Sequence, residues 1–84
     1  IGTIIDISDI MNQPYKFITI GKVPGDIYTY TRLVYSEETI ILDHEYNEIG
    51  VEDLKVGDTV VAFHSNAMTM SIPPQTSVFI IEVK

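Results

Sequence analysis

The chain has 84 residues, of which 45% are hydrophobic and 20% are charged, and it contains no cysteine. These figures predict one small folded domain over residues 1–84 that has neither a disulfide nor a thiolate metal site. Twelve acidic and five basic residues give a net charge of −7, which argues against general binding to nucleic acid or to anionic membranes. No apolar run approaches the roughly 18 residues that a membrane span needs, so we expect no membrane insertion.

The first half of the chain is typical of β-structure. Alternating apolar and β-branched residues predict strands over residues 1–8, 15–21, 27–35 and 39–43. In the first strand, strict alternation places Ile5 and Ile7 on one face and Ile4 on the other. Residues 9–14 interrupt the pattern with Asp9, Asn12 and Pro14, and the Pro-Gly pair of residues 22–26 predicts a chain reversal. We expect the strand at 39–43 to form a hairpin with the strand at 27–35.

The second half continues the pattern after a polar stretch over residues 43–50. Residues 51–54 are expected to form one helical turn, and strands are predicted at 59–64 and 77–83. Several short strands with regularly spaced turn signals favour an all-β fold, a small five- to six-stranded OB-like barrel with one short helical turn. An SH3-like barrel is the alternative. Because the chain begins with Ile1 rather than Met, we expect it to be processed or to be part of a longer protein.

The longest predicted loop runs from Ser65 to Thr76 and is the candidate binding surface. Loops of this length are often functional or packed on themselves. If the loop is extended, its apolar residues share one face and its hydroxyl residues the other. Two interpretations remain open: Met68, Met70 and Ile72 complete the barrel core, or they are exposed as a contact surface. The candidate binding residues are Met68, Thr69, Met70, Ser71, Ile72, Pro73, Pro74 and Gln75.

This loop, with the pattern S-x-x-M-T-x-S-I-P-P-Q, and the turn Leu54-Lys55-Val56-Gly57-Asp58-Thr59-Val60 before it resemble a group of small domains. The group consists of OB-like barrels of unassigned role in exported proteins of Gram-positive bacteria. The resemblance covers roughly residues 54–83 and implies a small barrel in a secreted, extracellular or cell-envelope protein. It transfers no catalytic residue. The related domains often carry a basic residue at the position of Met70, so an anionic ligand gains little support here.

The sequence contains no recognisable catalytic constellation. No serine lies in a Gly-x-Ser-x-Gly elbow, there is no glycine-rich phosphate loop, and His44 and His64 are not at a chelating spacing. The run Asp43-His44-Glu45, followed by Glu48, is interpreted as a solvated turn rather than a cation site. We interpret His64 as a hydrogen-bonded residue at the barrel rim. The sequence therefore predicts a protein that is not an enzyme, with no cofactor and no metal site.

Three functions remain open, and the first is a non-enzymatic binding or protein-interaction module whose loop or barrel face contacts a protein or peptide. The second is an OB-type binder of oligosaccharide or single-stranded nucleic acid. In that case Tyr28, Tyr30 and Arg32 form a stacking platform, since Tyr28 and Tyr30 are predicted to share one strand face. The third is a structural spacer or oligomerisation domain that pairs through a strand edge.

Overall fold

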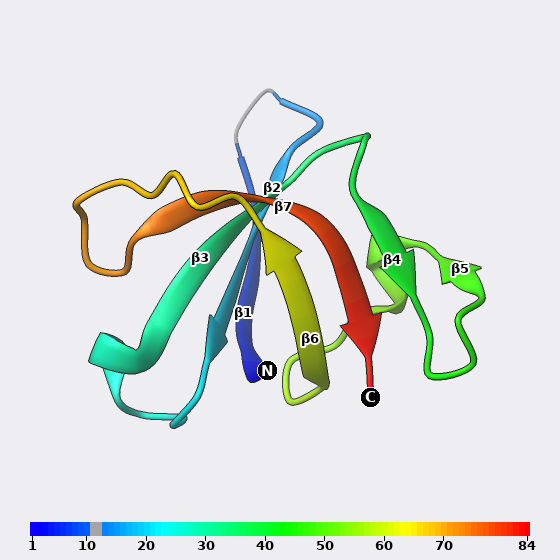
Figure 1. Cartoon of the computed structure of the whole chain (residues 1–84), viewed down its shortest axis with the longest axis horizontal. Coiled ribbons are helices and arrows are strands. Elements are labelled where there is room, and N and C mark those ends of the chain that lie inside the picture. The colour runs from blue at the N-terminus through cyan, green and yellow to red at the C-terminus, as the bar shows by residue number, and fades with distance from the viewer. Residues whose placement is uncertain (11–12) are drawn as a thin grey trace.

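The computed structural model describes residues 1–10 and 13–84, so residues 11 and 12 of the expected interruption at 9–14 lie outside the described part. Seven strands form one sheet in the order β3-β2-β1-β6-β7-β4-β5, and β3 also pairs with β7 (Figure 1). This extra pairing closes β1, β2, β3, β7 and β6 into a barrel. The strands are β1 (Gly2–Asp9), β2 (Lys16–Gly21), β3 (Tyr30–Tyr35), β4 (Ile40–Leu42), β5 (Glu48–Ile49), β6 (Thr59–His64) and β7 (Gln75–Val83). An all-β fold built on a small five-stranded barrel is thus confirmed.

Strand β1 contains an irregularity that the alternation pattern does not predict. Its register with β2 shifts between Ile4 and Asp6, so that Ile4 lies opposite Ile20 and Ile7 lies opposite Ile18. The extra residue reverses the direction of the side chains that follow it. Ile4 and Ile7 therefore both pack into the core, and the prediction that they lie on opposite faces is wrong.

The predicted strand at residues 27–35 is only partly a strand. Its first three residues form the 3-10 turn η1 (Ile27–Thr29), and β3 begins at Tyr30. The turn forms because the carboxylate of Asp26 accepts a hydrogen bond from the Tyr28 amide, while the Asp26 carbonyl accepts one from the Thr29 amide. An aspartate before a short segment is a cap signal, and here it overrides the strand propensity of Ile27, Tyr28 and Thr29.

Strand β7 is the element that the other parts of the sheet share. It pairs with β6 in antiparallel fashion. Strand β3 pairs in parallel with residues 75–77 of β7, and β4 pairs in parallel with residues 80–82. Because its first residues pair with Arg32–Val34, β7 begins at Gln75 rather than at residue 77. Strand β4 does not form the predicted hairpin with β3. It pairs with β7 and with β5, a strand that the polar sequence of residues 43–50 does not indicate.

The core fills the barrel interior with aliphatic side chains from every barrel strand. The second 3-10 turn, η2 (Val51–Asp53), confirms the predicted helical turn and is followed directly by the buried Leu54. Thr39 adds a buried polar contact, since its hydroxyl donates to the Val78 carbonyl at 2.9 Å and fixes the chain before β4 onto β7. The buried hydrophobic residues are Ile4, Ile18, Leu33, Ile41, Leu54, Val60, Val78 and Ile81.

On the outer face of the barrel, the ring of Tyr30 lies over Gly21 of the neighbouring strand. A β-carbon at Gly21 would come within 2.6 Å of Tyr30 Cδ1, and the Tyr30 hydroxyl accepts a hydrogen bond from the Gly25 amide at 2.8 Å. We expect Gly21→Ala to displace the ring and to destabilise the fold by about 1–3 kcal/mol.

Urea unfolding of the parent, Gly21→Ala, Tyr30→Ala and the double variant measures this contact as a thermodynamic cycle. Once Tyr30 is alanine, the Gly21→Ala substitution should have little effect. An equal loss of stability in both backgrounds would show that the ring does not occupy the space over Gly21.

Candidate functional site

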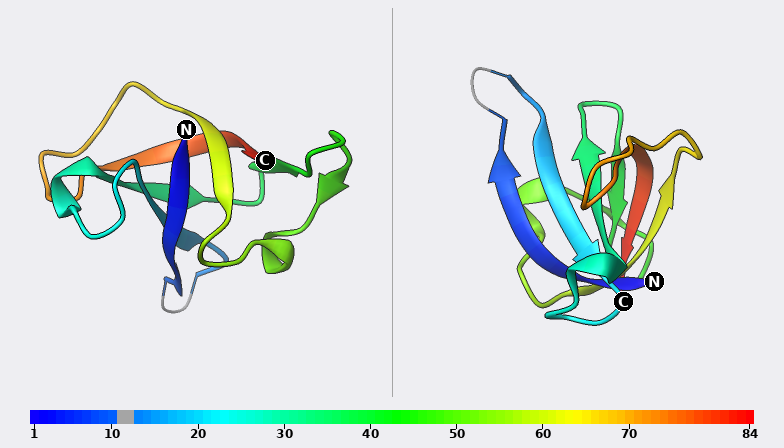
Figure 2. Two further views of the ribbon diagram at one scale, coloured as in Figure 1. Left: turned by 90° about the horizontal axis from the view of Figure 1, so that it is seen from below. Right: turned by 90° about the vertical axis from the view of Figure 1, so that its left-hand side faces the viewer.

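The loop between β6 and β7 runs back along the first residues of β7. The Ser65 amide donates to the Ser77 carbonyl at 2.9 Å, and the Thr69 amide donates to the Gln75 carbonyl at 3.0 Å. At the other end of the loop, the Pro74 carbonyl accepts a hydrogen bond from the Arg32 amide at 2.8 Å. The loop therefore connects to both β7 and β3, and it projects on the opposite side of the barrel from β4 and β5 (Figures 1 and 2).

The hydroxyl groups of the loop are turned toward its own backbone. Thr69 Oγ1 accepts a hydrogen bond from the Gln75 amide at 2.9 Å and lies 2.7 Å from Ser71 Oγ. Ser71 Oγ donates to the Pro73 carbonyl at 2.9 Å. The Ile72–Pro73 peptide bond is cis, and Pro73 is buried. The loop is thus closed on itself by polar contacts.

Thr76, on β7, holds the first residues of the loop by side-chain hydrogen bonds. Its side chain is buried, and its hydroxyl lies 2.9 Å from the carbonyl oxygens of both Ser65 and Ala67. A buried hydroxyl that contacts two carbonyls restrains the backbone between them. The sequence assigns Thr76 no role, because its partners become apparent only when the loop folds back.

The apolar side chains of the loop point outward. Met68 is 42% exposed, Ile72 is 65% exposed and Met70 is fully exposed. The interpretation in which these three residues complete the barrel core is therefore wrong. The physical reason is the hydrogen bonding of Thr69 and Ser71, whose hydroxyls are engaged within the loop and leave the apolar side chains beside them in solvent.

A hollow with a volume of about 380 Å³ lies between the loop and the outer face of β3 and β7. Among the predicted site residues, Met68, Thr69 and Gln75 line it, whereas Met70, Ser71, Ile72, Pro73 and Pro74 do not. Val34 and Ser77 also line it, and the sequence did not indicate them because β3 and β7 become neighbours only through the closure of the barrel. The remaining lining residues, Ala67 and Thr76, lie in the predicted loop but were not among the candidate binding residues.

The three residues of the predicted stacking platform, Tyr28, Tyr30 and Arg32, do not all lie on one strand. Tyr28 lies on η1, so it does not share a strand face with Tyr30, and that part of the prediction is wrong. Tyr28 is 82% exposed. The guanidinium of Arg32 lies 5.2 Å from the centre of the Phe17 ring on the neighbouring strand, a cation–π distance. Arg32 pairs with Gln75, so the two candidate sites that were considered separately are adjacent on one surface.

This surface differs from the rest of the molecule in charge. Residues 59–81 contain no aspartate, glutamate, lysine or arginine, although the whole chain has a net charge of −7. Arg32 supplies a positive charge beside the loop, and it forms no ion pair with another described residue. The loop and the hollow are therefore a neutral, partly apolar surface on an acidic domain.

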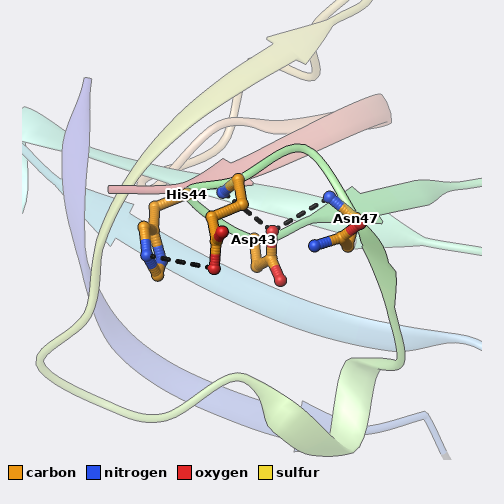
Figure 3. Close-up of polar contacts among 4 residues, drawn as sticks. Asp43, His44 and Asn47 are labelled. Atoms are coloured by element: carbon orange, nitrogen blue, oxygen red, sulfur yellow. Dashed lines mark hydrogen bonds and ion pairs between the residues drawn. The ribbon is translucent and has the colours of Figure 1, made fainter.

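The acidic turn after β4 is organised by Asp43 (Figure 3). Its Oδ1 atom accepts hydrogen bonds from the amides of Glu45 at 2.8 Å and Asn47 at 2.9 Å. Tyr46 has a positive φ of 65° in this turn, and His44 Nε2 lies 3.7 Å from Glu45 Oε1. The Asp43 carboxylate is thus engaged by the backbone. The described residues contain no group of three or more His, Cys, Asp or Glu side chains that is placed to hold a metal ion.

The Asp43 turn is expected to depend on pH. The backbone amide of Asn47, assisted by that of Glu45, lowers the pKa of Asp43 below its ordinary value of 3.8. Because the folded pKa lies below the unfolded one, the turn is stabilised above pH 3.8 and loses this stabilisation as the pH falls through the folded pKa. The amide chemical shifts of Glu45 and Asn47 should report this titration by NMR. A common midpoint at or above 3.8 would contradict the two hydrogen bonds.

His64 is partly buried at the end of β6, and its Nδ1 lies 2.8 Å from the Ser65 carbonyl, which confirms a hydrogen-bonded residue at the rim. Within residues 1–10 and 13–84, no helix has the length and apolar character needed to cross a membrane. Comparison of the chain with protein-family models, curated proteins and solved structures gave no match.

Proposed function

We propose that the chain is a non-enzymatic binding module that contacts a protein or peptide through one surface, here called the loop face. The loop face consists of the exposed side chains of Met68, Met70 and Ile72 and the adjacent hollow lined by Val34 and Gln75. An extracellular or envelope setting is proposed from the sequence resemblance alone. The OB-like character of the barrel also belongs to this proposal, because OB barrels bind ligands near the loop that joins their last two strands.

The observation that carries the proposal is the exposure of three apolar side chains on a loop whose polar groups are satisfied internally. Exposing such residues in water is unfavourable, by about 25 cal/mol for each Å² of apolar surface, and nothing in the loop's own hydrogen bonding requires these residues to be apolar. Clustered apolar exposure beside a concave surface is typical of sites that bind another molecule. The absence of formal charge from residues 59–81 lowers the desolvation penalty for such binding.

The test compares a substitution on the loop face with a matched one elsewhere. Binders are selected from a random linear peptide library on the parent domain, and their affinities are measured for Met70→Asp and Val56→Asp. Val56 is also an exposed apolar residue, but it lies in the turn at the opposite end of β6. We expect Met70→Asp to weaken binding at least about 10-fold, since a charge replaces a desolvated apolar contact, and Val56→Asp to have little effect. Equal effects would refute a site on the loop face.

A second candidate is an oligosaccharide site centred on β3. The observation that favours it is the guanidinium of Arg32 over the Phe17 ring, together with the exposed Tyr28 of η1. The turn η1 lies on the same side of the molecule as the loop (Figure 2). Single-stranded nucleic acid is a weaker alternative, because the net charge of −7 opposes phosphate binding. Titration of the domain with cell-wall glycan fragments and with short single-stranded DNA, followed by NMR, separates these ligands. Amide shifts confined to residues 28–32 and lost in Tyr28→Ala would favour this candidate over the loop face.

A further inference from the structure

A second, smaller hollow, here called the barrel-end hollow, lies at one end of the barrel interior and has a volume of about 110 Å³. On β6, Val60 is buried and Ala62 packs against the core, and alternation places His64 next on the same face. The inward-facing rows of the neighbouring strands end in the same way, with Thr31 on β3 and Lys22 directly after β2. The aliphatic side chains that fill the barrel are therefore followed by three side chains that can form hydrogen bonds, and all three line the barrel-end hollow.

The charge at the barrel-end hollow is opposite to that of the domain. Lys22 and His64 are its only lining residues with titratable side chains, and no aspartate or glutamate lines it, although the chain has a net charge of −7. Ile1 lines it as well, and its α-amino group is also basic. Lys22 and His64 form no ion pair with another described residue, whereas Lys16 is paired with Asp9. Basic groups without acidic partners around a concave surface attract an anion.

The hydrogen bonds already made at this end of the barrel determine which donors are available. His64 Nδ1 lies 2.8 Å from the Ser65 carbonyl oxygen, and because a carbonyl can only accept, Nδ1 carries a proton. Nε2 is therefore an acceptor in the neutral ring and becomes a donor when the ring takes up a second proton. The Thr29 hydroxyl is engaged with backbone groups of the preceding turn, whereas the Thr31 hydroxyl has no partner within residues 1–10 and 13–84.

We propose that the barrel-end hollow binds the carboxylate group of a small organic acid. The ammonium group of Lys22 and the protonated ring of His64 donate charge-assisted hydrogen bonds to it, and the Thr31 hydroxyl donates a neutral one. A carboxylate carries one negative charge, whereas a phosphate group carries up to about two, and the net charge of −7 opposes the larger charge. This site shares no lining residue with the hollow beside the loop, so the inference does not depend on the proposed function.

The first test titrates acetate into the domain at constant ionic strength and follows the amide shifts by NMR. The chain is acetylated at its amino terminus, so that the α-amino group of Ile1 neither binds nor titrates. We expect saturating shifts at Lys22, Thr31 and His64, and an affinity about 3- to 10-fold lower in Lys22→Met. Lys55→Met is the matched control, because it removes the same charge from an exposed lysine near the opposite end of β6, and it should have little effect.

The second test measures the acetate affinity as a function of pH. The affinity of the acetylated parent should rise at least about 3-fold as the pH falls from about 8 to about 5.5, the range in which histidine gains its charge, because His64 Nε2 then donates to the ligand. His64→Gln should abolish this dependence. His44→Gln is the control, since it changes the exposed histidine of the Asp43 turn, and it should retain the dependence of the parent.

Four results would overturn the proposal. Shifts that do not saturate, or equal effects of Lys22→Met and Lys55→Met, would show that acetate acts only as a general salt. An affinity that is independent of pH in the parent, or a dependence that disappears in His44→Gln, would remove His64 from the site. Inorganic phosphate that binds more tightly than acetate would overturn the assignment to a carboxylate. If His64→Gln does not fold, the pH dependence of the parent and of His44→Gln, together with the two lysine variants, still decides.

Discussion

Leu33→Ala is expected to destabilise the domain by about 2–5 kcal/mol, the usual range for truncating a fully buried leucine. Leu33 is completely buried in β3, and its neighbours Arg32 and Val34 lie on the outer face beside the loop. An 84-residue domain has a total stability of roughly 4–13 kcal/mol, so this single change should remove a large fraction of the free energy of unfolding. Urea unfolding followed by circular dichroism measures the effect.

The control for this experiment is Val56→Ala, which removes methyl groups from a largely exposed side chain. It should change the stability by no more than about 0.5 kcal/mol. If Leu33→Ala is as mild as this control, then Leu33 does not face the barrel interior. In that case the register of β3 against β2 and β7, and with it the position of the hollow, must be shifted by one residue.

Thr76→Val is expected to destabilise the domain by about 1–3 kcal/mol and to loosen the loop at the same time. The substitution keeps the size and branching of the side chain but removes the hydroxyl that bridges the carbonyls of Ser65 and Ala67. Part of the loss is local, so amide exchange at Thr69, whose amide bonds to Gln75, should accelerate more than exchange in β1 and β2.

Thr76→Ser is the matched variant, because it keeps the hydroxyl and loses only a methyl group. We expect it to preserve slow exchange at Thr69 even if the global stability falls slightly. Uniform acceleration across the whole domain in Thr76→Val would show that the hydroxyl contributes only to overall stability. It would then have no particular role in holding the loop over β7.

The barrel was largely predictable because its signals are local. Alternation along each strand and the Pro-Gly turn identify most elements within a residue or two, and these signals do not depend on what the strand pairs with. Where the predictions are wrong, a specific contact prevailed over the local pattern. Asp26 caps η1 and removes Tyr28 from the strand, and an extra residue between Ile4 and Asp6 reverses the pattern of β1.

The site was only partly predictable, for a different reason. The loop was identified from its composition, and Met68, Thr69 and Gln75 do line the hollow. Whether Met68 and Met70 are buried or exposed depends on where the hydroxyls of Thr69 and Ser71 find partners, which no periodicity encodes. Val34 belongs to the site only because β3 and β7 are paired across more than 40 positions of sequence. Such a pairing cannot be deduced from a single sequence.

The self-contained hydrogen bonding of the loop has a consequence for how this surface can change. Thr69, Ser71 and Thr76 hold the loop backbone, while the side chains of Met70 and Ile72 extend into solvent. The residues that determine the shape of the loop are therefore separate from those that meet a partner. Substitutions at the outward positions should alter recognition with little effect on the free energy of unfolding. One scaffold can therefore acquire new partners by point mutation, much as antibody loops diversify on a constant framework.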